Sequence, residues 1–166
     1  MLHFPFQWER QPGPVVFWSH KATASSVYSA GMKPEQALWG SYVSRAGFGG
    51  CGDKAAPFWE VSFREGGAVG VSRVAVDRFG RRLRNVRVVL LGEDRQELVA
   101  ASHVNPDDAE GFTVDFDHPV EGTHYVRLEK VAPLQNGDDR SFNLNAVGVF
   151  GSLGEGGGKR KESFPS

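Results

Sequence analysis

Short alternating or β-branched segments recur from residue 57 onward in this 166-residue chain, and they constrain its fold more than any other feature. Residues 112–117 show the pattern most clearly, because Phe112, Val114 and Phe116 alternate with polar neighbours, as in a half-buried strand. Turn-forming residues separate successive segments by roughly 8–12 residues, a spacing typical of sandwiches and barrels. We predict strands at residues 58–63, 69–78, 85–91, 112–117, 124–129 and 142–150.

The composition agrees with an all-β fold. The 21 glycines and 9 prolines suit tight turns and argue against long helices, although residues 33–39 could form one short helix with Pro34 in its first turn. Cys51 is the single cysteine, so an internal disulfide is excluded and core packing must hold the domain together. No segment reaches the roughly 20 apolar residues that span a bilayer. The N-terminus does not resemble a signal peptide and no disulfide is possible, which favours an intracellular or organellar location, but a sequence that starts after processing stays open and the location is left undecided.

The charge balance and the motifs argue against several classes of function. The chain has 19 Lys and Arg against 20 Asp and Glu, so no global field favours nucleic acid. The sequence contains no Gly-x-Ser-x-Gly, no phosphate loop and no His-Glu-x-x-His. We therefore predict a binding protein and not an enzyme.

Two extensions flank the strand-forming region, which covers residues 20–151. Residues 1–19 form an extended arm rich in proline and aromatic residues, and residues 152–166 form a glycine-rich basic tail. Prolines remove backbone donors from the arm, and the composition of the tail is typical of disorder, so we expect neither extension to order alone. We predict that the two extensions dock on a partner, with contacts from Phe4, Phe6, Trp8, Lys159, Arg160 and Lys161.

Seven segments, taken in chain order, resemble the discoidin family, also called coagulation factor 5/8 type C domains. They read KATASSVY at 21–28, PEQALWG at 34–40, PFWEVSF at 57–63, VSRVAV at 71–76, RLRNVRV at 82–88, HYVRL at 124–128 and LNAVGVFG at 144–151. The resemblance implies an all-β, jelly-roll-like antiparallel sandwich of about eight strands with no catalytic residues. It also implies that loops at one end of the sandwich bind the ligand, which in this family is carbohydrate, phospholipid or protein.

The resemblance also indicates ligand-binding residues. Members that bind fucose-type sugars use a histidine and two arginines, and Arg78 and Arg82 occupy the arginine positions here, with Arg81 between them. The acidic residue expected after the first arginine is missing, and the histidine position falls near residues 50–52, which read Gly-Cys-Gly. Aromatic residues of the preceding loop, Tyr42 and Phe48, could stack on a sugar ring or insert into a partner. These five residues, Arg78, Arg81, Arg82, Tyr42 and Phe48, form the predicted ligand site.

The arginines also have a simpler interpretation. Arg84 and Arg87 complete a cationic stretch with the predicted site residues, and it could form a basic groove for an anionic ligand. The alternative is a solvated sheet face neutralised by nearby carboxylates, which we favour for Arg84 and Arg87.

We predict no cofactor, and we leave open whether the domain binds a structural calcium ion. The family's Asp-Gly-Asn calcium turn reads Trp39-Gly40-Ser41 here, so the usual carboxylate ligand is missing. Only backbone carbonyls, or the aspartates of the turns at residues 107–108 and 138–139, remain as candidate ligands.

Two functional hypotheses follow. In the first, the chain is a binding module that recognises a carbohydrate or protein partner through loops at one end of the sandwich. In the second, it is a structural accessory subunit of a larger multiprotein assembly, which docks through its arm and tail and binds no glycan.

Overall fold

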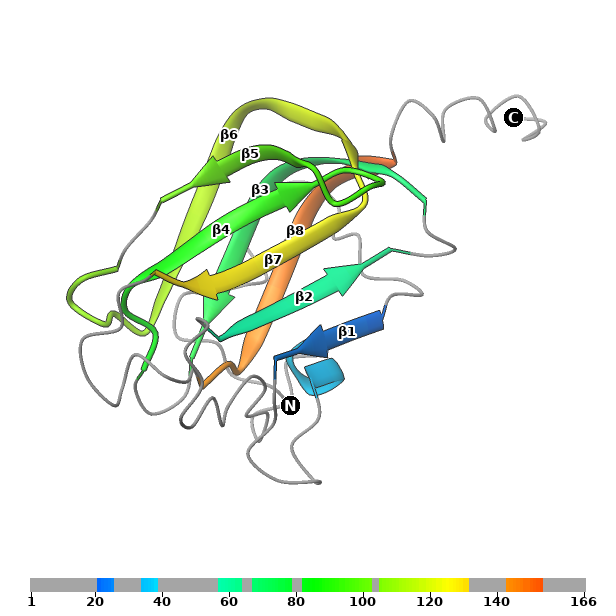
Figure 1. Cartoon of the computed structure of the whole chain (residues 1–166). Coiled ribbons are helices and arrows are strands. Elements are labelled where there is room, and N and C mark those ends of the chain that lie inside the picture. The colour runs from blue at the N-terminus through cyan, green and yellow to red at the C-terminus, as the bar shows by residue number, and fades with distance from the viewer. Residues whose placement is uncertain are drawn as a thin grey trace, which may run out of the picture.

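Two antiparallel sheets stack face to face in the computed structural model of the chain (Figure 1). The structure describes residues 21–25, 34–38, 57–63, 67–78, 82–102, 105–131 and 143–153. Across these ranges the chain forms eight strands and one short 3-10 helix. The predicted all-β sandwich of about eight strands is therefore confirmed.

The larger sheet has five strands in the order β1-β2-β7-β4-β5. They are β1 (Lys21–Ala24), β2 (Phe58–Ser62), β7 (Tyr125–Lys130), β4 (Val86–Leu91) and β5 (Glu97–Ala101). The smaller sheet has the order β6-β3-β8, and its strands are β6 (Gly111–Thr123), β3 (Val69–Asp77) and β8 (Ala146–Leu153). In Figure 1 the larger sheet lies in front of the smaller one.

The hydrophobic core lies between the sheets. Alternate residues of each strand point inward, as the period of two requires. Trp59 is fully buried in this core, and its indole N–H donates to the Pro34 carbonyl at 3.0 Å, which ties the helix η2 (Pro34–Leu38) to β2. The short helix predicted within residues 33–39 is confirmed. The other buried side chains include Val61, Val74, Val76, Val88, Leu90, Phe112, Val126, Leu128, Val147 and Val149.

Strand β6 is longer than its apolar alternation indicates. The strand runs from Gly111 to Thr123, and most of its residues after Val114 are exposed, including Pro119. A proline cannot donate a hydrogen bond to a neighbouring strand, so it fits only an edge strand. Strand β6 is an edge strand, because it pairs with β3 alone.

A glycine permits the close approach of β8 to β3. A Cβ atom on Gly151 would lie 1.9 Å from the Gly70 carbonyl oxygen, next to the register shift between Val71 and Arg73. The irregular pairing therefore depends on the missing side chain.

Backbone hydrogen bonds bring several strand ends together at one end of the sandwich. The Arg78 N–H donates to the Glu110 carbonyl at 2.9 Å, and the Asn145 N–H donates to the Asp77 carbonyl at 2.8 Å. The ends of β3, β6 and β8 therefore meet, and the connections that leave them lie close together. We call this region the loop end and define it as residues 77–78, 82–85, 105–110 and 143–145.

Candidate functional site

The Asp108 carboxylate joins two connections of the loop end. Its two oxygens accept the backbone N–H groups of Arg82 at 3.0 Å and Leu83 at 2.7 Å. The Arg78 guanidinium lies against the same residue, donating to the Asp108 carbonyl at 2.6 Å, with Nε 3.3 Å from the carboxylate. Asn105 adds a bond from its side-chain amide to the Leu83 carbonyl at 3.2 Å. These bonds fix the β3–β4 connection against the β5–β6 connection.

The backbone of the loop end is strained. Among the described residues other than glycine, five have positive φ, and four of these belong to the loop end: Arg82, Asn85, Asn105 and Asp108. Asparagine and aspartate tolerate this region, but Arg82 at φ 85° has no such local preference. The bond to Asp108 holds Arg82 in a conformation that its own chemistry disfavours. Strain of this kind is typical of functional sites.

A buried polar pair lies beneath these loops. Asp77 is fully buried and accepts a hydrogen bond from the Asn145 side-chain amide at 2.8 Å. Burial raises the pKa of Asp77 from 3.8 to about 6, because the charged form is poorly solvated there. Asp77 Oδ1 and Asn145 Oδ1 have no hydrogen-bond partner within the part of the chain that the structure describes.

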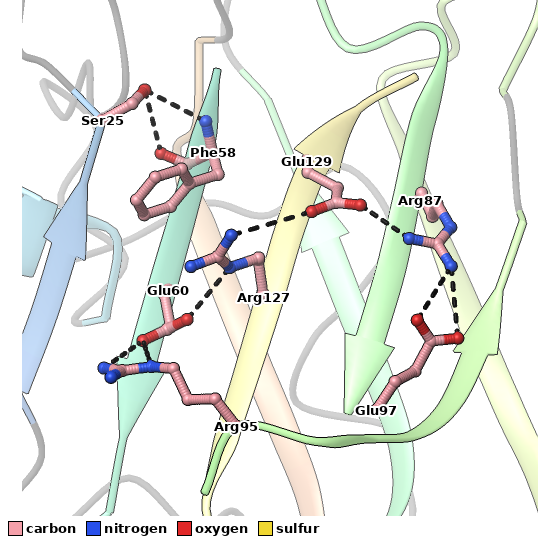
Figure 2. Close-up of polar contacts among 8 residues, drawn as sticks. All are labelled: Ser25, Phe58, Glu60, Arg87, Arg95, Glu97, Arg127 and Glu129. Carbon is pink, nitrogen blue, oxygen red and sulfur yellow. Dashed lines mark hydrogen bonds and ion pairs between the residues drawn. The ribbon is translucent and has the colours of Figure 1, made fainter. Parts of the chain in front are cut away.

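A second polar arrangement covers the outer face of the five-stranded sheet. Glu60, on β2, is nearly buried, with a side chain 4% exposed, and accepts from Arg127 on β7 at 3.0 Å. Glu129, two residues along β7, accepts from Arg87 on β4 at 2.6 Å. Arg87 also lies 3.3 Å from Glu97 on β5. Figure 2 shows the resulting row of alternating charges across four strands.

Arg95 completes this row from outside the strands. It follows β4 in the turn that leads to β5, and its φ is 60°. Its guanidinium passes over the Tyr125 ring at 4.2 Å and donates to Glu60 at 2.9 Å. Hydrogen bonding to Glu60 raises the pKa of Arg95, and the bond to Glu129 does the same for Arg87. We call Glu60, Arg87, Arg95, Glu97, Arg127 and Glu129 the outer-face network.

The outer-face network borders an open pocket of about 330 Å³. Val89 and Leu91, the residues of β4 that alternate with its core side chains, form the apolar floor. The rim consists of five residues of the network: Arg87, Arg95, Glu97, Arg127 and Glu129.

The structure brings some of the predicted site residues together. Arg78 and Arg82 both lie at the loop end, linked through Asp108. Tyr42, Phe48 and Arg81 lie outside the described residues. The predicted docking residues Phe4, Phe6, Trp8, Lys159, Arg160 and Lys161 also lie outside them, as does the calcium turn at residues 39–41.

Arg87 takes the role that we favoured for it, since carboxylates of neighbouring strands neutralise it. Arg84 does not lie in a strand, because β4 begins at Val86. The outer-face pocket was missed by the sequence analysis. The sequence does show which residues of segments 85–91 and 124–129 point away from the core. The register of the two strands is needed to show which of these residues lie next to one another.

Within the described ranges, no group of three or more His, Cys, Asp or Glu side chains is arranged to hold a metal ion. The same ranges contain no helix with the length and apolar character needed to cross a membrane.

Among the solved structures that are similar to this chain are carbohydrate-binding modules and an F5/8 type C domain. A mutant of the lectin-binding domain of lectinolysin in complex with Lewis b is 23% identical, with a TM-score of 0.64 over 84% of this chain and 100% of that one. The family 32 carbohydrate-binding module of C. perfringens NanJ, in complex with galactose, is 15% identical, with a TM-score of 0.65 over 82% and 97%. An F5/8 type C domain from Bacteroides fragilis is 12% identical, with a TM-score of 0.60 over 81% and 92%.

These similarities identify the class of fold. The chain has the galactose-binding-like β-sandwich of discoidin, or F5/8 type C, domains and family 32 carbohydrate-binding modules, as the sequence resemblance predicted. The sequence matches no protein-family model and no curated protein.

Proposed function

We propose that this chain is a non-catalytic module that binds a carbohydrate through the loops at one end of the sandwich. The observation that carries the proposal is the conformation of Arg82, which is held at φ 85° by the Asp108 carboxylate. A module that did not need this arginine in place could relieve the strain with glycine. The similar folds of modules solved with Lewis b and with galactose support the choice of ligand class.

The two arginines have different roles in this proposal. The Arg78 side chain is only 14% exposed and its guanidinium bonds Asp108, so it orders the loops. Arg82 is the residue that we expect to donate to sugar hydroxyls, as a planar guanidinium suits paired oxygens. Tyr42, Phe48 and Arg81 remain further candidates for ligand contact.

Screening on a glycan array, followed by calorimetry with the full chain, tests the proposal. We expect at least one glycan to bind, and we expect Arg82→Ala to weaken it by about tenfold, the loss of one good polar contact. Arg73→Ala is the matched control, because Arg73 pairs with Asp115 on the outer side of the three-stranded sheet. Absence of binding to every glycan, with and without calcium, would overturn the proposal.

The proposal needs no catalytic group and no cofactor. Calorimetry with and without calcium also tests whether the domain binds a structural calcium ion. The alternative, an accessory subunit that docks through its arm and tail, rests on residues 1–19 and 152–166. Residues 152 and 153 belong to β8, the rest of the arm and tail lies outside the described ranges, and no observation favours that alternative.

A further inference from the structure

The pocket on the outer face of the five-stranded sheet shares no residue with the loop end. Its volume of about 330 Å³ lies within the range of ~300–1,000 Å³ that is usual for small-ligand sites. Strands β4, β5 and β7 supply most of its lining, so a rigid sheet and not a mobile loop fixes its shape. This feature is independent of the loops on which the proposed function rests.

The floor of the pocket is apolar. Val89 and Leu91 point away from the core, between the core residues Val88 and Leu90, yet they are only 3% and 7% exposed. The side chains around the pocket shield them from solvent, and the pocket opens above them. Because little of this apolar surface still meets water, the floor would contribute shape and van der Waals contact to a ligand more than a hydrophobic gain.

The rim offers donors and acceptors in alternation. Guanidinium groups donate only and carboxylates accept only, and Figure 2 shows them side by side around Arg87 and Glu129. Arg127 uses its Nε–H for Glu60, and its Nη1 lies 3.9 Å from the Glu129 carboxylate, an ion pair too long to be a hydrogen bond. Glu97 is 51% exposed, so one edge of the rim faces solvent. Groups of both kinds are therefore available to a ligand.

The charges of the rim are balanced. Three arginines and two glutamates line the pocket, and Glu60, which binds two of those arginines, brings the sum to zero. A charged ligand would have to break existing ion pairs to find a partner. A neutral ligand with several hydroxyl groups can accept from the guanidiniums and donate to the carboxylates without breaking them.

We propose that the outer-face pocket is a second binding site, which takes one ring of a neutral, hydroxyl-rich ligand such as a hexose. The C–H face of the ring would lie on Val89 and Leu91, and its hydroxyl groups would meet Arg95, Arg127, Glu97 and Glu129. The site goes beyond the proposed function, since it would operate even if the loop end bound nothing. If both sites bind, one chain engages two sugar units.

Chemical-shift mapping on the isotope-labelled full chain tests this site. The probes are lactose, maltose and cellobiose as neutral disaccharides, and glucuronic acid as an anionic sugar. We expect at least one neutral probe to shift the amide signals of Val89, Leu91 and Arg127. Val89→Phe fills the pocket without removing a charge and is expected to lower that affinity by about tenfold or more.

Two controls separate this site from other effects. Thr113→Phe adds the same bulk to the outer face of β6, on the smaller sheet, and is expected to leave the affinity unchanged. Arg82→Ala is also expected to leave it unchanged, so a failure of the loop-end proposal is distinguishable from a failure here. If Val89→Phe does not fold, Glu97→Gln, which removes one exposed carboxylate, serves instead and is expected to weaken binding about threefold.

Three results would overturn the inference. The first is the absence of shifts on this face with every neutral probe. The second is an unchanged affinity for the neutral probe in Val89→Phe, or in Glu97→Gln where that variant is used instead. The third is a response to glucuronic acid alone, which would contradict the charge-balance argument.

Discussion

Asp108 and Arg82 lie on different connections of the sandwich, and the Asp108 carboxylate accepts the Arg82 backbone N–H at 3.0 Å. The same carboxylate accepts the Leu83 N–H at 2.7 Å. One side chain therefore sets the backbone from which Arg82 projects, and the loop end depends on it.

Replacement of Asp108 with alanine should loosen the loop end. Two backbone donors and the Arg78 guanidinium lose their carboxylate partner, so we expect unfolding free energy to fall by about 1–3 kcal/mol in urea titrations. Asp115→Ala is the matched control, because Asp115 is 56% exposed and should cost less than about 0.5 kcal/mol. Equal losses in the two variants would contradict the role assigned to Asp108.

The buried Asp77 makes stability depend on pH. Its pKa is about 6 in the folded protein and 3.8 is its ordinary value, so the folded state holds this proton more tightly. The protonated Asp77 therefore adds to the free energy of unfolding. This contribution is fully present below about pH 4 and is lost as the pH rises through 6. Asp77→Asn cannot ionise, so it should become more stable than the native protein by up to about 3 kcal/mol between pH 4 and 7.

Urea titrations of the native protein and of Asp77→Asn at several pH values measure this difference directly. Other carboxylates change in both proteins alike, so their effects cancel in the comparison. A difference that stays constant between pH 4 and 7 would show that Asp77 does not titrate in this range.

Glu60 should be the most sensitive member of the outer-face network. Its side chain is 4% exposed and bonds both Arg95 and Arg127, so Glu60→Gln leaves two guanidiniums without their shared anion. Both arginines keep contact with solvent, and we therefore expect a loss of about 1–2 kcal/mol, below the cost for a fully buried pair. Glu97→Gln, at a side chain 51% exposed, should change stability by less than about 0.5 kcal/mol. A thermal unfolding series that gave the reverse order would refute this ranking.

Gly151 should tolerate no side chain. A Cβ atom there would lie 1.9 Å from the Gly70 carbonyl oxygen, so Gly151→Ala must push β8 away from β3. We expect a loss of at least about 2 kcal/mol, typical of overpacking that moves backbone. Gly122→Ala provides the comparison, because its Cβ would meet open space and only its φ of 79° resists the change, a cost of about 1–2 kcal/mol. Circular dichroism melts of both variants would show whether Gly151 is the more costly position.

Alternation and turn signals were sufficient to predict most of the sandwich. Residues 58–63, 69–78 and 85–91 became β2, β3 and β4 with boundaries within one residue. These strands carry apolar residues on their inner face, so the hydrophobic pattern reports burial directly.

The missed strands carry a weaker pattern for physical reasons. Strand β5 reads Glu97 to Ala101 with no fully buried side chain, and β1 has one, Ala22. Both lie at the edges of the larger sheet. An edge strand has a partner on one side only and is partly exposed to solvent, so its sequence carries a weaker apolar pattern.

The candidate sites depend on contacts between distant parts of the chain. Arg78 and Arg82 were identified through a family resemblance, but their link to Asp108 joins residues 26–30 positions apart. The pairing of Glu60 with Arg127 spans 67 positions and follows from the register of β2 with β7. Single-sequence reasoning identifies residues and faces, whereas such partners require the fold.

Pro119 on the edge strand β6 bears on how neighbouring molecules meet. It has no N–H to offer to a further strand, and the exposed carboxylates Asp117 and Glu121 disfavour a like strand at the same margin. A second copy therefore cannot extend the smaller sheet through this edge. Copies of the domain can be crowded on a surface, or joined in tandem, without polymerising there through strand-to-strand pairing.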